Sequence, residues 1–480
     1  HLSMARTTIK VTNNKDSGAG SLRQAITDSQ KKNGGSYDIV FQSNAKPTNS
    51  LTTGYFTIAL QSPLPFIYRN DVRINVTEPR SVILVPSAAS SSPNTKSGVM
   101  KSNSGGVNGS MLYIGDPNYM YPTSALPSFN PKYRWKDLYF PDVLINGVNF
   151  IRNNAKGQSG SSGSGGGLGT GGAISVFAGD LKVTNAVFQD LKATGGAGGR
   201  GSTGGEGSVF MDVFKKGDEQ RGGSGGKGGA SSIPLRLSVK TDAFASGSYL
   251  PNGGSGGAPG KGNSVCGGNE GASKHAGKAG GSGSNSTIFG VGGGGGGAGG
   301  GGAWNYNDYW LTCWNVPQMS FWSGGSGGRG GRGGAFAGNG GTGGRGGSAN
   351  GKNLFGAGPG RTGPTTGSTG QSGDAKGSAI ALWGNYARQI SGPINGQTIS
   401  ASLKLDNVRF IGNDSAPGVV YSSENNVYVK DVLVGSDSGT LKQVNPGRSS
   451  GLGSWAGELN IIENRPSIIS GVSAPRKNNV

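Results

Sequence analysis

Few residues in this chain could carry out acid–base catalysis. Asp406, Asp414 and Asp431 lie near β-rich repeats, and paired carboxylates are the groups that hydrolyse glycosidic bonds. Asp406 and Asp431 occupy turn-prone positions, which favours a structural role. His1 and His275 are the only histidines, so a Ser-His-Asp triad has little to draw on. No HExxH, EF-hand or P-loop motif occurs. We expect no catalysis, no metal and no cofactor; a polysaccharide lyase or hydrolase is the alternative.

An aromatic segment at residues 304–322 is the main candidate binding site. It holds four of the chain's seven tryptophans. Trp and Tyr dominate binding hot spots, so an exposed segment could stack on sugar rings or fill a pocket on another subunit. The alternative is a hydrophobic anchor that fixes the surrounding glycine-rich region to the rest of the protein. The candidate binding residues are Trp304, Tyr306, Tyr309, Trp310, Trp314, Phe321 and Trp322.

The only two cysteines are Cys266 and Cys313, and they are the candidate disulfide. They are too few for a disulfide scaffold and lack the spacing of a zinc site. In an oxidising compartment they can form one bond. The chain starts at His1 without a leader, which fits signal-peptide removal and equally a fragment boundary. We expect a secreted protein, extracellular or on the cell surface.

The chain is strongly basic, with 44 basic and 25 acidic residues and a net charge of +19. This charge suits nucleic acid, acidic polysaccharide or an anionic cell surface. Arg329, Arg332 and Arg345 stand between glycines, as in RGG segments that bind RNA. RGG segments are usually disordered, whereas these arginines recur within a period of three, so solvated spacers are the favoured interpretation. Nucleic acid is disfavoured, and cell-surface polysaccharide remains a candidate partner.

Glycine accounts for 97 of the 480 residues, whereas the hydrophobic types reach only 32%. One large globular core is therefore not expected. Collagen is excluded because there is no strict Gly-X-Y repeat through the chain and only 22 prolines are present. No run of eighteen apolar residues occurs, so we expect no membrane span.

The β-rich parts contain an internal repeat. Each copy alternates apolar and polar residues and has Gly, Asn or Asp at its fifth position. Short strand candidates precede three copies, at 171–174, 377–380 and 418–421. A helix is expected at residues 21–26, with Ser21 as its N-cap. A β-solenoid is the favoured fold and a two-sheet antiparallel sandwich the alternative. The repeats are residues 143–150, 181–188, 403–410 and 427–434.

Residues 11–26, 37–41 and 56–65 resemble the opening of bacterial secreted right-handed parallel β-helix proteins that carry a CSLREA-type N-terminal segment. The repeats are similar to the coils that follow in that family. The resemblance covers residues 5–195 and 375–435. The resemblance implies a right-handed parallel β-helix in an exported protein associated with the cell surface. It implies no enzymatic activity.

Residues 194–376 form a long glycine-rich insertion with a local period of three. A disordered linker is the default for such a composition. If the insertion is ordered, its stability must come from the backbone, since few side chains are available to pack. Glycine helices with three residues per turn, as in polyglycine II, could lie side by side and hydrogen-bond to one another. The tip adhesins of some tailed phages resemble this insertion, although the β-helix frame departs from them.

The expected architecture is all-β, a right-handed parallel β-helix with an ordered glycine-rich lobe. We expect a self-assembling structural protein of a surface fibre or sheath, or a surface adhesin; a phage-type receptor-binding adhesin is another alternative. Homo-oligomers could stack head to tail through open solenoid ends, with 459–462 and 467–469 as docking strands. The expected parts are an N-terminal cap with first coils at 1–155, a coil at 156–193, the insertion at 194–376, and C-terminal coils and tail at 377–480.

Overall fold

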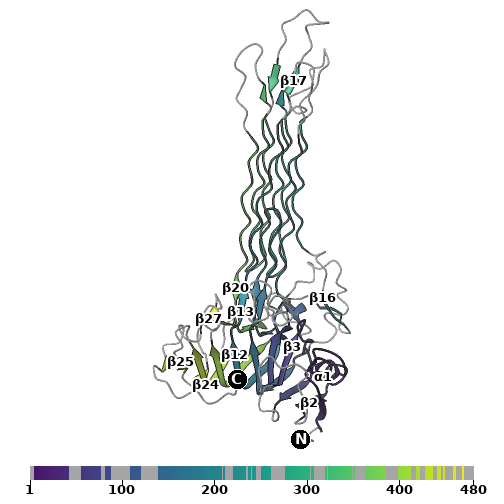
Figure 1. Cartoon of the computed structure of the whole chain (residues 1–480), viewed down its shortest axis with the longest axis vertical. Coiled ribbons are helices and arrows are strands. Elements are labelled where there is room, and N and C mark those ends of the chain that lie inside the picture. The colour runs from purple at the N-terminus through teal and green to yellow at the C-terminus, as the bar shows by residue number, and fades with distance from the viewer. Residues whose placement is uncertain are drawn as a thin grey trace, which may run out of the picture.

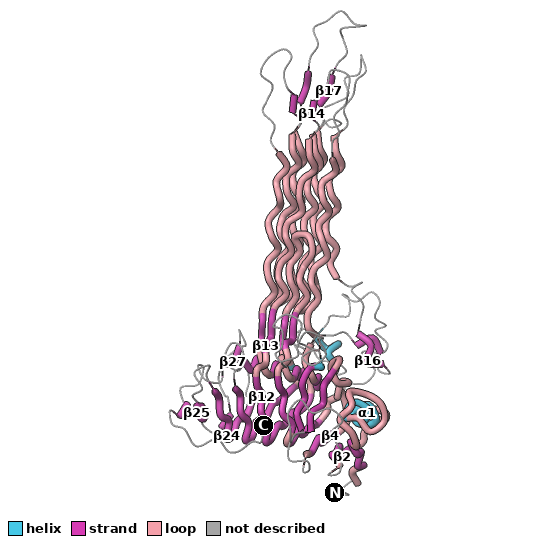
Figure 2. The backbone as a smooth tube through the Cα atoms, viewed as in Figure 1, coloured by secondary structure: helices cyan, strands magenta, loops and turns pink. Residues whose placement is uncertain are grey.

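The protein consists of an all-β base and a long lobe that projects from it (Figures 1 and 2). In the base the chain is mostly parallel β-strand, whereas the lobe is built of glycine-rich segments lying side by side. This computed structural model describes residues 5–42, 56–76, 82–87, 107, 109–120, 139–207, 209–210, 220–233, 236–238, 241–244, 250–260, 276–302, 304–306, 319–321, 323–348, 350–351, 363–384, 398–411, 418–421, 427–435, 441–444, 447–448, 458–460 and 468–469.

A 13-stranded sheet dominates the described part of the base. Its main run is parallel throughout and follows chain order: β1 (Thr7–Val11), β2 (Ser36–Phe41), β4 (Asp71–Asn75), β7 (Asp142–Asn146), β12 (Gly179–Gln189), β22 (Ala401–Ile411) and β24 (Val427–Gly435). A parallel branch joins it at β12 through β3 (Phe56–Leu60), β5 (Val82–Pro86) and β8 (Val148–Ile151).

A smaller sheet supplies the other side of the core. Its parallel strands are β6 (Leu112–Ile114), β11 (Ile174–Val176), β21 (Ile380–Leu382) and β23 (Gly418–Tyr421). The apolar side chains of β6, β11 and β21 share one buried cluster with those of the large sheet, so the two sheets enclose a continuous core. Rows of that core run across strands, as in Ile74, Ile145, Val183 and Leu405, or Ile114, Val176 and Leu382.

The four repeats predicted from the sequence lie in register on neighbouring strands. Their last positions show this most clearly, because the rings of Phe150 and Phe188 stack with centroids 5.1 Å apart, and Phe188 and Phe410 stack at 5.2 Å. All three rings are buried. Val434 of the fourth repeat is the Cα partner of Phe410. The prediction of stacked repeats is therefore confirmed.

The fifth position of the repeat bends the chain. Gly147, Asn185 and Asn407 have φ angles of 77°, 53° and 53°, in the left-handed region that favours Gly and Asn. The two asparagines also form a ladder of hydrogen bonds: Asn185 donates to Oδ1 of Asn146 at 2.7 Å, and Asn407 donates to Oδ1 of Asn185 at 2.6 Å. These residues set the bend and link successive copies.

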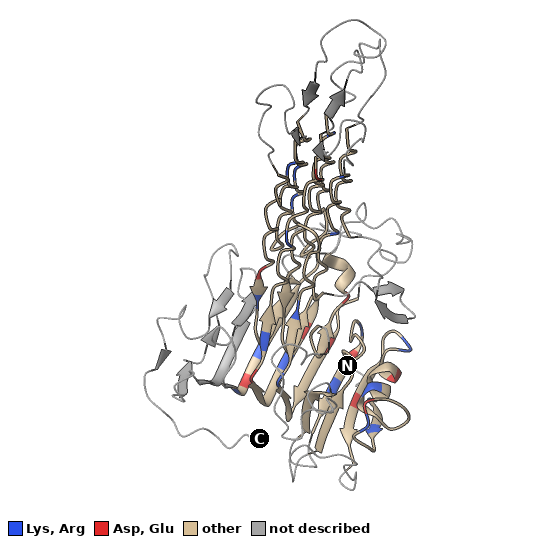
Figure 3. Cartoon of the chain, turned by 45° about the horizontal axis from the view of Figure 1, so that its top comes forward, with Lys and Arg blue, Asp and Glu red and all other residues tan. Residues whose placement is uncertain are grey.

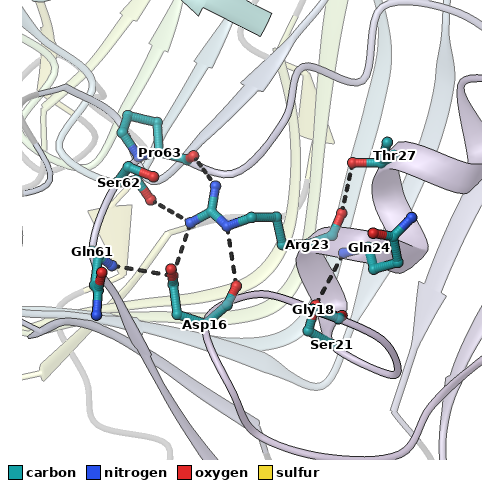
Figure 4. Close-up of polar contacts among 9 residues, drawn as sticks. All are labelled: Asp16, Gly18, Ser21, Arg23, Gln24, Thr27, Gln61, Ser62 and Pro63. Carbon is teal, nitrogen blue, oxygen red and sulfur yellow. Dashed lines mark hydrogen bonds and ion pairs between the residues drawn. The ribbon is translucent and has the colours of Figure 1, made fainter.

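Helix α1 (Leu22–Ser29) covers the N-terminal end of the large sheet, and Ser21 is its N-cap, as predicted. Oγ of Ser21 accepts from the backbone N–H of Gln24 at 3.1 Å. Arg23 fixes the surrounding loops (Figure 4): its Nη2 lies 2.8 Å from Oδ1 of Asp16 and 2.8 Å from the carbonyl oxygen of Ser62. The helix thus caps the core and ties down the chain on both sides of it.

At the other end of the base, antiparallel strands of the same chain pair with the last parallel strands. β27 (Glu458–Asn460) pairs with β23, β25 (Leu441–Val444) and β26 (Gly447–Arg448) pair with β24, and β28 (Ile468–Ile469) pairs with β25. Parts of the expected docking strands, within 459–462 and 467–469, thus pair inside one chain. This pairing occupies edges that head-to-tail stacking would use.

Candidate binding surface

The lobe enters and leaves the base through short parallel strand pairs. β9 (Asn154–Lys156) pairs with β13 (Lys192–Thr194), and β10 (Gly169–Thr170) pairs with β20 (Ala375–Lys376). Between them the chain runs outward and back repeatedly (Figure 2). The bundle also takes in residues 157–168, which precede the insertion. The other described segments of the lobe are 195–207, 220–232, 250–260, 276–287, 291–302, 323–334, 338–348 and 363–373.

The segment 291–302 is the centre of the bundle. It contains only glycine apart from Val291 and Ala298, and every residue in it is buried. Its successive N–H groups donate to three neighbouring segments in rotation, repeating every third residue. Examples are Gly295 to the oxygen of Gly226 at 3.0 Å, Gly296 to Gly341 at 2.9 Å and Gly297 to Gly281 at 2.9 Å.

The carbonyl groups of the central segment accept hydrogen bonds from three further segments. Donors are Gly257 to Ala298 at 2.8 Å, Gly328 to Gly297 at 2.7 Å and Gly205 to Gly299 at 2.9 Å. The centre is thus surrounded by six segments, and the ring closes because neighbours within it also bond to one another. A repeat of three residues per turn is the period of a polyproline II-type helix, which has no hydrogen bonds of its own. Bonds between segments therefore satisfy the backbone.

Close approach of the segments requires glycine at the inner positions. A Cβ on Gly296 would lie 2.1 Å from the carbonyl oxygen of Gly328, and one on Gly297 would lie 2.1 Å from that of Ser255. Both distances are far below van der Waals contact. Ser, Thr, Asn, Lys and Arg occupy exposed positions on the outer segments. The tightly packed inner positions thus require glycine, whereas the exposed positions on the outer segments accept many side chains.

Some exposed backbone N–H groups on the outer segments bond to side chains of the next segment. The N–H of Thr342 donates to Oγ of Ser368 at 2.8 Å, and that of Arg345 donates to Oγ1 of Thr365 at 2.8 Å. On these outer segments, hydroxyl oxygens three residues apart accept hydrogen bonds from the backbone N–H groups. Inside the bundle, backbone carbonyl oxygens of neighbouring segments do this.

A second hydrophobic cluster, which we call the joint, fixes the lobe to the base. Turns and ends of the glycine-rich segments insert apolar side chains among residues of the base. Phe289 packs edge-on against Trp383 at 5.3 Å, and Phe336 lies 5.9 Å from the same ring. The hydroxyl of Tyr113 donates to the carbonyl oxygen of Ser232 at 2.9 Å. Its buried members are Phe66, Tyr68, Tyr113, Tyr119, Met120, Leu168, Phe177, Ala178, Ile233, Ile288, Phe289, Val291, Ala381, Trp383 and Ile399.

The aromatic segment lies at the opposite end of the lobe from the joint (Figure 1). β17 (Trp304–Tyr306) pairs antiparallel with β18 (Met319–Phe321), which makes Trp304 the Cα partner of Phe321 and Tyr306 that of Met319. β14 (Val209–Phe210) and β19 (Asn350–Gly351) form a parallel pair at the same end. Three predicted binding residues are therefore brought together at the tip.

The remaining predicted binding residues, Tyr309, Trp310, Trp314 and Trp322, lie outside the described residues, and so do Cys266 and Cys313. In the described part of the chain, the joint is the hydrophobic cluster that fixes the lobe to the base. Its aromatic members, such as Phe289 and Phe336, were not recognised in the sequence because they are isolated. The available signal was their position, since each interrupts a glycine-rich run where the chain turns back.

The acidic residues considered for catalysis do not form a site in the described part of the chain. Asp406 lies on β22 between Thr184 and Lys430 of the adjacent strands, and Asp414 lies outside the described residues. Asp431 lies on β24. The described residues contain no group of three or more His, Cys, Asp or Glu side chains that could hold a metal ion.

One row of carboxylates does cross the large sheet. Asp142 lies between Asp71 and Asp180 on the adjacent strands. Burial raises the pKa of Asp142, and the charges of these two neighbours raise it further. Arg6 offsets part of this charge, because its Nη1 lies 2.6 Å from Oδ2 of Asp71 and its Nε lies 2.6 Å from Oδ1 of Asp38. Repulsion between these carboxylates is therefore a local destabilising effect of placing the three strands side by side.

No protein-family model, no curated protein and no solved structure matches this chain. Among the described residues, no helix has the length and apolar character needed to cross a membrane.

Proposed function

We propose that this chain is an extracellular structural protein of the adhesin type, without catalytic activity, that holds an aromatic binding segment away from a surface. One observation carries the proposal: the pairing of Trp304–Tyr306 with Met319–Phe321 lies at the end of the lobe farthest from the base. A lobe stabilised by backbone hydrogen bonds is suited to be a spacer, because its side chains need not form a core.

We further propose that the base is a right-handed parallel β-helix of a secreted protein. The in-register parallel strands, the stacked Phe150, Phe188 and Phe410 rings and the capping helix α1 support this fold. A β-helix gives the lobe a rigid foundation because each strand is fixed by neighbours on both sides. In this arrangement the base serves attachment and the tip serves contact.

Adhesion is favoured over a fibre or sheath. A head-to-tail fibre needs free strand edges at the ends of the base, yet β23 and β24 pair with β27, β25 and β26 of their own chain. A second copy that continued the parallel stack directly from β23 and β24 would have to displace those strands. The paired strands β17 and β18, in contrast, lie at the far end of the lobe and involve no strand of the base.

Replacing residues 304–322 by a short Gly-Ser linker tests the proposal. We expect the variant to keep its thermal transition, because the joint is untouched, and to lose binding to the cells or surface polysaccharides that retain the native protein. Tyr68→Phe, in the joint, is the matched control and should bind normally. Unchanged adhesion in the linker variant would refute a role for the tip.

A further inference from the structure

One face of the lobe carries a regular row of arginines. Arg329 and Arg332 are one turn apart on segment 323–334, and Arg345 is on the adjacent antiparallel segment 338–348. Hydrogen bonds from Gly343 to the oxygen of Gly328 and from Gly346 to that of Gly325 fix the register of the two segments.

This register places Arg345 one turn beyond Arg329. Successive arginines in the row are therefore about 9 Å apart along the lobe, since a turn of three residues rises about 3.1 Å per residue. Lys and Arg positions recur along the lobe in Figure 3. The row runs in the order Arg332, Arg329, Arg345 toward the tip.

Within the described part of the chain, acidic residues are scarce around this row; Glu206 lies on segment 195–207, which is hydrogen-bonded to the segment of Arg345. The segments 276–287, 323–334, 338–348 and 363–373 contain no Asp or Glu. Arg329, Arg332 and Arg345 are exposed, and within the described part of the chain none of them forms a salt bridge. The register places the short polar residue Ser326 beside Arg345 and Thr342 beside Arg329. The three arginines are thus exposed along the lobe and form no salt bridge among the described residues.

The spacing of the arginines and the geometry of the guanidinium group indicate which anionic ligand fits the row. A guanidinium group binds a carboxylate through two parallel hydrogen bonds, which favours Arg over Lys for this acid. A nucleic-acid strand places its phosphates closer together than the arginines, and single-strand binding usually adds aromatic residues on which bases stack. The row offers none, because the segments 276–287, 323–334, 338–348 and 363–373 contain no aromatic residue.

We propose that the face formed by Arg329, Arg332 and Arg345 binds a linear acidic polysaccharide that carries one carboxylate on every second sugar ring. The chain of the polysaccharide lies along the axis of the lobe, with one carboxylate at each arginine. This site is separate from the aromatic tip, so it does not depend on the adhesive role proposed for residues 304–322.

Titration of the full-length protein with hyaluronan fragments, which have this charge spacing, tests the proposal by calorimetry. The variant R329Q/R332Q/R345Q is compared with R200Q/R221Q/K227Q, which removes the same charge from exposed positions on segments 195–207 and 220–232. We expect the first variant to bind about tenfold more weakly, because three exposed charge pairs each contribute modestly. The control should bind as the native protein does.

Salt and competing polymers complete the experiment. Binding should weaken as ionic strength rises, because exposed charges are screened, and uncharged dextran should not compete. Equal weakening in both variants would overturn the proposal in favour of non-specific attraction to a basic protein. Tighter binding of single-stranded DNA than of hyaluronan, lost in the first variant, would overturn it in favour of nucleic acid. Absence of hyaluronan binding at low salt would overturn it outright.

Discussion

Nδ2 of Asn407 donates to Oδ1 of Asn185 at 2.6 Å, although 222 residues separate the two in sequence. The whole glycine-rich insertion lies between them, yet the strands on either side, β12 and β22, pair as direct neighbours. The base therefore accommodates the insertion at residues 194–376 between two paired strands without any break in the parallel sheet.

Asn185→Ala should destabilise the base by about 1–2 kcal/mol. The variant loses the hydrogen bonds to Asn146 and Asn407, and Ala is strained at a φ of 53°. Asn185→Gly keeps the backbone conformation without strain and should cost less. Urea denaturation followed by circular dichroism measures both, and an equal cost for the two variants would contradict a backbone contribution.

Phe188→Ala should cost about 3–5 kcal/mol, because it removes the middle ring of the Phe150, Phe188 and Phe410 stack and leaves a cavity in the core. Phe140→Ala is the control, since this side chain is exposed and should change stability little. The measurement is the midpoint of guanidinium denaturation. Similar midpoints for the two variants would show that the stack contributes little.

Gly296→Ala should destabilise the lobe by several kcal/mol, because the added Cβ collides with the carbonyl oxygen of Gly328 and the six surrounding segments leave no space for relaxation. Ser326→Ala on the exposed face should be nearly neutral. Hydrogen exchange at glycine amides reports the difference, with faster exchange expected in the first variant throughout 291–302. Native protection in Gly296→Ala would contradict the tight packing of the centre.

Tyr113→Phe should weaken the joint by about 1–3 kcal/mol. The hydroxyl donates to the carbonyl oxygen of Ser232 and accepts from the N–H of Ser110, so its removal leaves two buried groups unpaired. Limited proteolysis should then cut the glycine-rich segments near the base sooner. Tyr37→Phe, at a partly buried position on β2, is the control and should be cut at the native rate.

Asp142→Asn should stabilise the base at neutral pH. The pKa of Asp142 is higher in the folded state than in the unfolded state, so folding favours the protonated carboxyl group. The free energy of unfolding therefore decreases as pH rises from about 4, the unfolded pKa, to the higher pKa of the folded state. The gain at pH 7 should be on the order of a few tenths of a kcal/mol, because solvent screens the row. Thermal melts at pH 7 and pH 3 test this, and an equal gain at both would contradict an electrostatic origin.

The base was largely predictable from its sequence, because its information is local and repeated. Each repeat marks its buried positions by alternation and its bend by Gly147, Asn185 or Asn407. Ser21 likewise marked the start of α1. What the repeats could not predict was the arrangement of antiparallel strands at the C-terminal end, since β25 to β28 are short and carry no repeat.

The lobe was predictable in its period and in the side-by-side hydrogen bonding of its segments, but not in which segment lies at the centre. Any of its glycine-rich segments could have been central from composition alone, although the run from Gly292 to Gly302, broken only by Ala298, has no polar residue to place outside. The joint was hidden for another reason: Leu168, Ile233 and Phe336 are single apolar residues far apart in sequence, and only the fold assembles them.

The hydrogen bonds around residues 291–302 run across the long axis of the lobe, from one segment to the next. A force applied to the tip along that axis therefore loads many of these hydrogen bonds at the same time. A force that pulled one segment sideways would instead break them one after another. If a binding partner pulls on the tip, the lobe should resist extension. The force would then be transmitted to the joint before any single segment separates from the bundle.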